Sequence, residues 1–348
     1  MNITHRSYNA TVAKVRAMYG KRVSASDYSE LVNKQSVSEI ADYLKKNTHY
    51  SEILSSVDVN TVHRGFLESL LRRFNFEMYL KITGFERISK QEFYNFKIVN
   101  AEIDVILSCI RHINANSEDR IINDIPIYIN GMTHFDLIEI AKVHSFEEML
   151  ALLKKTPYAD VLKDEHTDSN GKVDYSSCEV KLRTMYFNRL ENYVSRLAPQ
   201  EADMVNSMIL IDIDLINVIN AYRMTAFFGE DEKTIKEMMF PFCGRLSEKK
   251  QTEIYSAPDA EEFIKRFSKT YYGRQISDSG YDMNNLEDNA NRLRFKYAKL
   301  ALKTSSKASA SVYAFTYLMG VELKNLICII EGVRYGIPAK EIEKLIII

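Results

Sequence analysis

Two carboxylates, Asp212 and Asp214, lie two positions apart in the apolar stretch Ile209–Arg223, and such a pair could act as a general acid and a general base. On an α-helix, however, side chains two positions apart point about 200° away from each other. The pair therefore cannot act on one substrate. An acid also stands at the Asp214 position in two related stretches, as Glu102 and Glu322. This recurrence favours a packing or ion-pair role over catalysis.

Other candidate sites for chemistry are weaker. The sequence contains no GxGxxG or GxxxxGK[ST] phosphate loop, no HExxH zinc motif and no GxSxG nucleophile elbow. His134 and His144 stand ten residues apart, and we interpret them as unrelated surface or capping histidines rather than a metal pair. The segment Asp168–Gly171 imitates the middle of a calcium loop but lacks the required terminal acids, so an Asx/Gly turn is predicted. We predict no catalytic, cofactor-binding or metal-binding residue.

Composition narrows the class of protein further. The 348 residues include 46 basic and 47 acidic side chains, and this balance argues against a nucleic-acid binder, which needs a basic excess to neutralise phosphates. With only 12 glycines and 6 prolines, long helices are favoured over a turn-rich β architecture. We therefore predict an all-α fold.

The cysteines and the hydropathy pattern bear on the cellular compartment. The cysteines are far apart without a CxxC motif, so reduced, buried thiols in a cytosolic protein are predicted. They are Cys109, Cys178, Cys243 and Cys328. The N-terminus lacks the apolar segment of a signal peptide. No apolar run reaches about 18 residues, and the best candidate, Ile209–Ile219, is interrupted by acids. A soluble chain without a membrane span is expected.

The stretch around Asp214 is apolar on nearly all sides. Its polar side chains Asp214, Asn217 and Asn220 follow at intervals of three and form one line on a helix. Such a helix lies inside a bundle with a single side for polar contact. Related stretches carry Glu102 and Glu322 at the Asp214 position, and the intervals are 112 and 108 residues. We interpret the chain as one unit written three times.

Two further landmarks repeat in the same order. The first is a Ser or Asp that begins a helix, a Glu three positions later, and a Tyr further on. Its members are Ser36, Glu39 and Tyr50; Ser145, Glu148 and Tyr158; and Asp259, Glu262 and Tyr272. The second stands twelve residues earlier, at Ser24, Thr133 and Ser247, and Asp27 and Asp136 complete an N-cap pattern in the first two. The third copy has Lys250 at that place, which spoils the pattern.

These landmarks divide the chain into repeats at residues 24–132, 133–246 and 247–348. Residues 1–23 are interpreted as the remnant of a permuted repeat rather than a separate domain. The period of about 110 residues is far longer than the roughly 20–50 residues of small solenoid repeats. Compact lobes around a shared axis are therefore expected.

Each repeat is predicted to contain a helix, a short helix, a long amphipathic helix and the buried helix. The predicted long helices are Val62–Lys81, Glu179–Leu197 and Leu286–Ala301. A short helix is predicted at Glu147–Lys155, with Pro157 ending it. Gly229 and Gly336 are predicted to stop two of the buried helices. The polar segments Asp164–Asp174 and Gly273–Asp288 are predicted loops.

Several short segments carry a resemblance to a known family. They are Ser7–Ala10 with Val15–Met18, Phe227–Gly229 with Arg245–Ser247, and Arg334–Pro338 with Glu341 and Ile342. Together with the length and the threefold repeat, they resemble the C subunit of V-type (archaeal and bacterial A/V-type) ATPases, whose eukaryotic counterpart is the d subunit. Thr11 and Lys14 depart from the pattern of the opening segment, which suggests a divergent member.

The resemblance implies a mechanical role. Family members are all-helical, funnel-shaped proteins with pseudo-threefold symmetry that lie peripherally on the cytoplasmic side of the membrane. They hold the central stalk on the proteolipid rotor ring, transmit torque, bind no nucleotide and carry no metal. Polar residues from the three equivalent helices are expected to line an axial cavity. Candidate partner contacts are Asp27, Arg245 and Arg334, although solvated helix ends are the preferred explanation of these side chains.

Two alternatives remain open from the sequence. The first is a soluble helical-repeat scaffold unrelated to rotary ATPases, which would need no membrane ring. Neighbouring genes that encode rotary ATPase subunits would argue against it. An enzyme ranks third, because it would require a polar cluster present in one repeat only.

Overall fold

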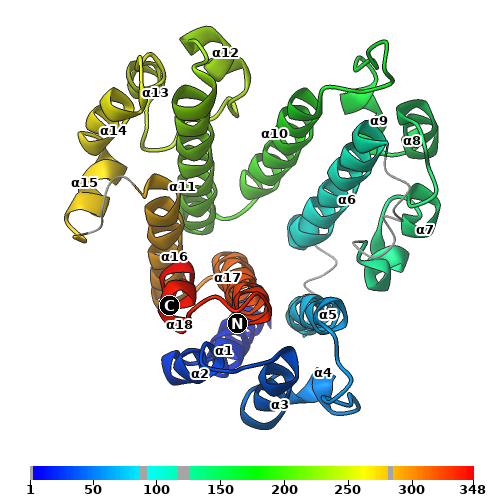
Figure 1. Ribbon diagram of the computed structural model, residues 1–348. Coiled ribbons are helices and arrows are strands. Elements are labelled where there is room, and N and C mark those ends of the chain that lie inside the picture. The colour runs from blue at the N-terminus through cyan, green and yellow to red at the C-terminus, as the bar shows by residue number, and fades with distance from the viewer. Residues whose placement is uncertain (1–2, 86–91, 117–124, 281–284) are drawn as a thin grey trace. The chain divides into compact units, whose positions relative to one another are not determined.

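The computed structural model describes residues 3–85, 92–116, 125–280 and 285–348, and the regular structure in these ranges is helical, without a strand. The all-α prediction is confirmed for these residues. The chain forms two compact units, Met1–Lys90 with Phe295–Ile348, and Gln91–Arg294 (Figure 1). The first unit is thus built from both ends of the chain.

In the first unit, α17 lies at the centre and packs against α1 and α5. The elements are α1 (Ile3–Tyr19), α2 (Ala25–Leu31), α3 (Val37–Asn47), α4 (Ser51–Leu54), α5 (Arg64–Thr83), the second half of α16 (Leu286–Thr304), α17 (Ala308–Arg334) and α18 (Ala339–Leu345). The Arg16 guanidinium of α1 donates hydrogen bonds to the carbonyl oxygens of Leu302, Lys303 and Ser305 at 2.7–3.0 Å. These bonds satisfy carbonyls that the end of α16 leaves without helical partners.

By length and composition alone, α17 is a helix that could cross a membrane. The best candidate predicted from the sequence was a different stretch, Ile209–Ile219. Of the apolar window in α17, 61% is buried inside the protein. The helix is therefore packed as the core of the first unit, as long apolar helices of globular domains are.

The second unit contains two groups of packed helices. Its elements are η2 (Glu92–Asn95), α6 (Phe96–Ala115), η4 (Ile127–Met132), α7 (Leu137–Ile140), α8 (Phe146–Leu153), α9 (Pro157–Leu162), α10 (Tyr175–Val194), α11 (Pro199–Arg223), the π-helical turn η5 (Met224–Phe228), α12 (Glu232–Glu237), α13 (Glu248–Tyr255), α14 (Ala260–Ser268), α15 (Tyr271–Ser277) and the first half of α16. α6 and α10 lie side by side, and α13, α14 and α15 pack in succession beside α11 (Figure 1).

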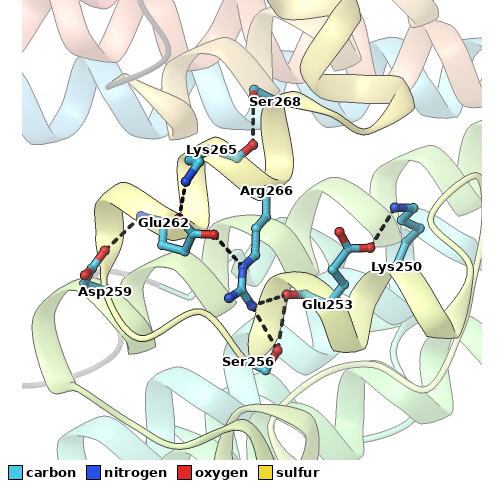
Figure 2. A network of polar contacts seen from close by, with 8 residues as sticks. All are labelled: Lys250, Glu253, Ser256, Asp259, Glu262, Lys265, Arg266 and Ser268. Atoms are coloured by element: carbon cyan, nitrogen blue, oxygen red, sulfur yellow. Dashed lines mark hydrogen bonds and ion pairs between the residues drawn. The ribbon is translucent and has the colours of Figure 1, made fainter.

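A polar network joins α13 to α14 (Figure 2). The Arg266 guanidinium donates to the carbonyl oxygen of Glu253 at 2.7 Å and to Ser256 Oγ at 3.1 Å. Its Nε also binds the Glu262 carboxylate at 3.1 Å. One side chain of α14 thereby caps the last turn of α13 and fixes the angle between these two short helices.

Helix starts follow the predicted caps in most places. The side chains of Ser36, Ser145 and Asp259 accept the N–H of the Glu three positions later at 2.8–3.2 Å, as predicted. The predicted cap at Thr133 is wrong. Its hydroxyl instead donates to the backbone carbonyls around the end of η4, and Asp136 itself caps α7.

The predicted long helices exist with shifted bounds, as α5, α10 and α16. Pro157 does more than end a helix, since it is the first residue of α9. The predicted turn at Asp168–Gly171 is confirmed, because the Asp168 carboxylate accepts the N–H of Asn170 at 2.8 Å. The loop predicted at Gly273–Asp288 is partly wrong, since α15 extends to Ser277; residues 281–284 of this loop lie outside the described residues.

The cysteines are free thiols, but their predicted burial is only partly correct. Cys109 and Cys178 are buried, and burial raises the pKa of each thiol to about 12. Cys243 is exposed and Cys328 is half-buried. Cys243 lies in an irregular turn whose following backbone N–H groups, rather than this side chain, face the core.

At two helical glycines, substitution by alanine is expected to change the stability of the protein in opposite directions. A Cβ at Gly273 would lie 2.1 Å from the Phe267 carbonyl oxygen, whereas nothing lies within 4 Å of a Cβ at Gly320. Gly273→Ala forces a backbone shift and is expected to cost about 3 kcal/mol of the free energy of unfolding. Gly320→Ala should instead stabilise α17 by about 0.5–1 kcal/mol. Urea unfolding of both variants measures the two changes in the free energy of unfolding. If both substitutions stabilise the protein, or both destabilise it, the prediction is wrong.

Candidate functional site

A buried carboxylate occurs in each of the helices α6, α11 and α17. Glu102 and Asp214 are 0% exposed and Glu322 is 5% exposed. A buried charge is costly unless hydrogen-bond donors surround it. Each of these acids is indeed met by a tyrosine hydroxyl and by at least one backbone N–H. We refer to the three sets of contacts as the acid clusters.

Asp214 has the largest number of backbone donors. The N–H groups of Gly244, Arg245 and Leu246 donate to its carboxylate at 2.8–3.1 Å, and the Tyr272 hydroxyl donates at 2.9 Å. Burial raises the pKa of this carboxyl, and the hydrogen bonds offset part of the rise. A Cβ at Gly244 would lie 2.5 Å from Asp214 Oδ2, so the close approach of the backbone requires glycine.

Glu102 forms the second acid cluster. The Tyr158 hydroxyl donates to it at 2.6 Å, and the backbone N–H of His134 is a further donor. His134 Nδ1 lies 3.0 Å from both carboxylate oxygens. The histidine side chain is 42% exposed, so this cluster reaches the surface on one side.

Glu322 forms the third cluster, with partners from the opposite end of the chain. The N–H of Val23 donates at 2.8 Å and the Tyr50 hydroxyl at 3.0 Å. His49 Nε2 lies 2.9 Å from Oε1, and both of these side chains are buried, at 7% and 5% exposure. The cluster therefore fastens α2 and α3 to α17.

The clusters explain why the sequence landmarks share one period. Each acid contacts the tyrosine of the helix-start landmark and a backbone N–H next to Ser24, Thr133 or Ser247. The landmarks were recognisable in the sequence, but the contacts between them were not predicted. Nor were His49 and His134 predicted as partners of the acids. One sequence signal could have revealed these contacts. The acid and the tyrosine are separated by a nearly constant number of residues, 56 for Glu102 and 58 for Asp214.

Two buried asparagines each form a pair of hydrogen bonds with the backbone of one distant residue. Asn217 donates to the Phe240 carbonyl at 2.9 Å and accepts the Phe240 N–H at 3.0 Å. Asn325 makes the same pair of bonds with Ile347, at 2.7 and 3.0 Å. Asp214 and Asn217 are 0% and 1% exposed. Polar residues of the three equivalent helices were expected to line an axial cavity, but Asp214 and Asn217 do not, because their polar atoms are used inside the unit.

The last turn of each buried helix is tied to the beginning of a long helix. Arg111 donates to the Tyr175 hydroxyl at 3.0 Å, and Arg223 pairs with Glu287. In the first unit the charges are exchanged, since Glu331 pairs with Arg64 at 3.0 Å. Arg111 and Arg223 each stand nine residues after the buried acid, and Glu331 occupies this position in the third helix. Arg64 compensates for the exchange of charge.

Asp212, the other member of the supposed acid–base pair, has a separate partner. Its carboxylate accepts from Arg294 of α16 at 2.8 Å, and Asp104 binds Arg183 of α10 at 2.7 Å in the same manner. Asp212 and Asp214 therefore have different structural roles. Among the described residues, no group of three or more His, Cys, Asp or Glu side chains is placed to hold a metal ion.

The three predicted partner-contact residues differ in the exposure and the hydrogen bonding of their side chains. The exposed Arg245 guanidinium lies over the Tyr271 ring at 4.3 Å, and the exposed Arg334 guanidinium lies over the Tyr335 ring at 5.6 Å. Asp27 is half-buried and forms a capping box with Ser24, and it accepts the Tyr43 hydroxyl at 2.9 Å. The structure thus gives Asp27 a definite role in starting α2.

This role predicts a pH dependence. Partial burial raises the pKa of Asp27, but the hydrogen bonds from Ser24 and Tyr43 lower it more, so the net shift is downward. The stabilisation is therefore complete above the unfolded pKa of about 3.9 and is lost as pH falls through the folded pKa. Asp27→Ala should cost about 1 kcal/mol at pH 7 and less at pH 3, below the unfolded pKa of about 3.9. Urea unfolding at both pH values tests this, and an equal cost at both would contradict it.

The helices and acid clusters define an all-α protein in which buried carboxylates hold short helices to long ones. Comparison with known proteins identifies the family to which this chain belongs. The ATP synthase (C/AC39) subunit family matches residues 11–345, and the chain therefore belongs to that family. The resemblance to the C subunit of V-type ATPases is confirmed.

Relatives include archaeal proteins named as the C subunit of an A-type ATP synthase. The protein of Archaeoglobus fulgidus is 23% identical over 347 residues, which cover 97% of this chain and 95% of the relative. That of Methanosphaera stadtmanae is 21% identical over 352 residues, with 98% and 88% covered. The Thermococcus kodakarensis protein is 26% identical over 237 residues, 67% of this chain and 61% of the relative.

Proposed function

We propose that this chain is a non-catalytic adaptor subunit of a rotary ATPase. It links the central stalk to the membrane proteolipid ring and transmits torque for ATP-coupled transport of protons or sodium ions. The observation that carries the proposal is the family match over residues 11–345. In this role the chain lies peripherally on the cytoplasmic side of the membrane, held by protein contacts.

The acid clusters support a mechanical role. Torque transmission requires that short helices do not slide on the long helices that carry them. Buried, fully hydrogen-bonded carboxylates resist sliding, because displacement would leave charges and N–H groups without partners. We further propose that the three repeats surround a pseudo-threefold axis as a funnel, and that Asp27, Arg245 and Arg334 contact partners. The two arginines have the better support, since their side chains are exposed.

Purification of the tagged full chain from its native membranes tests the proposal. Stalk and proteolipid subunits should co-purify, and deletion of the gene should abolish ATP-driven ion transport by membrane vesicles. Re-expression of the wild-type chain is the control and should restore transport. Recovery of the chain without any ATPase subunit would contradict the proposal and favour the unrelated scaffold.

A further inference from the structure

We propose that Phe227 and Phe228, the aromatic tip of α11, form a docking site for a protein segment that carries an apolar side chain flanked by lysine or arginine. The two rings are 74% and 73% exposed, whereas the other exposed large apolar side chains described in this unit reach at most 43%. Single exposed apolar residues are common, but two adjacent and nearly free rings point to a partner.

The backbone at the tip is specialised. α11 ends in the π-helical turn Met224–Phe228, followed by Gly229 at φ 65°, the predicted helix stop. α17 ends without such a turn, at Tyr335 and Gly336. Counted from the buried acid, Gly229 is at position 15 and Gly336 at position 14, so the turn contains one additional residue. π-helical turns are rare and occur frequently at functional sites.

Aromatic contacts link the tip to the core of the unit. The Phe227 ring meets the Tyr222 ring edge-on at 6.5 Å, and Tyr222 meets Phe263 of α14 at 5.5 Å. Phe263 itself is 0% exposed. This stack connects Phe227 to the core, so the Phe227 ring is held in place before a partner arrives. Such preorganisation lowers the entropy lost on binding.

The neighbouring charges select the chemistry of the partner. Arg223 is paired with Glu287, and Lys236 with Glu232. Within the described residues, Glu230 and Asp231 form no ion pair, and hydrogen bonds from Thr234 lower the pKa of Asp231. Lys233 also lowers the pKa of Asp231, but it is shared with Glu237, whose carboxylate lies 3.9 Å from the Lys233 Nζ. The segment that directly follows the rings in the sequence therefore carries an excess of negative charge.

An anionic membrane surface would be repelled by these charges, whereas lysine or arginine beside an apolar side chain would be attracted. The same cations would also interact favourably with the faces of the rings. The partner is accordingly a protein segment and not a lipid bilayer.

The experiment is photo-cross-linking in the source cells with full-length Phe228→benzoylphenylalanine. We expect a cross-link to one protein, at an apolar residue with Lys or Arg within a few positions on either side. Glu230→Lys with Asp231→Lys should reduce its yield at least tenfold, and Ile138→Ala, a matched exposed apolar residue, should not. Phe227→Ala with Phe228→Ala should leave the thermal midpoint of the isolated chain unchanged, which would show that the rings support a partner and not the fold.

The inference rests on the proposed function only in expecting a rotary ATPase subunit as the partner. A cross-link of the stated chemistry to another protein would uphold the docking site and contradict the proposed function. Cross-linking to lipid only, to no protein, or to a segment without basic residues would overturn the docking site. In that case the co-purification experiment still decides the proposed function.

Discussion

Replacing Asp214 by alanine is expected to lower the free energy of unfolding by about 3–5 kcal/mol, an exceptionally large effect for one substitution. The carboxylate is fully buried and accepts four hydrogen bonds. Its removal leaves three backbone N–H groups and the Tyr272 hydroxyl without an acceptor, and each unsatisfied buried group costs about 1–3 kcal/mol. Urea denaturation of the full chain measures the loss.

Two further variants separate this mechanism from a general weakening of α11. Asp203 is exposed on the same helix, and Asp203→Ala should change stability by no more than about 0.5 kcal/mol. Tyr272→Phe removes one donor, and its cost should be smaller in the Asp214→Ala background than in the wild type, since the acceptor is already absent. Additive costs, or a loss below about 1 kcal/mol for Asp214→Ala, would show that the hydrogen bonds do not hold the cluster.

The parts of this fold that could be predicted from the sequence are those set by short-range rules. Caps at Ser36, Ser145 and Asp259 depend on residues three positions apart, and the stop at Gly229 depends on one residue that adopts a left-handed conformation easily. The all-apolar surroundings of Asp214 likewise identified a buried helix. For each of these, one turn of helix contains the necessary information.

The parts that could not be predicted depend on contacts between distant segments. Neither His49 nor His134 has a local pattern that connects it with an acid. At Thr133 the sequence has the N-cap pattern, but the structure does not use it. Asp136 caps the helix instead, and the threonine hydroxyl donates to a nearby carbonyl. Phe227 was recognised as part of a family segment, yet the π-helical turn that contains it is a conformation that no propensity rule predicts.

The period of the landmarks was the one long-range signal, and the first unit shows what it meant. Glu322 binds Val23, His49 and Tyr50, although these residues precede it by 272–299 positions. Residues 23–50 thus supply α17 with the kind of partners that Asp214 finds further along the chain. Both ends of the chain are thereby joined through one buried carboxylate.

Glu322→Ala is therefore expected to release the N-terminal segment from α17 and to destabilise the protein by about 3–5 kcal/mol. Local opening should unfold the backbone around Lys34, Lys45 and Lys46 of the α2–α3 region and admit it to the protease, so limited trypsin digestion should cleave there at least tenfold faster. Glu331→Gln, on the same helix, breaks only the half-exposed pair with Arg64 and should cost less than about 1 kcal/mol without faster cleavage. Equal cleavage rates for both variants would show that packing of α1 and α5 on α17, and not the buried acid, closes the unit.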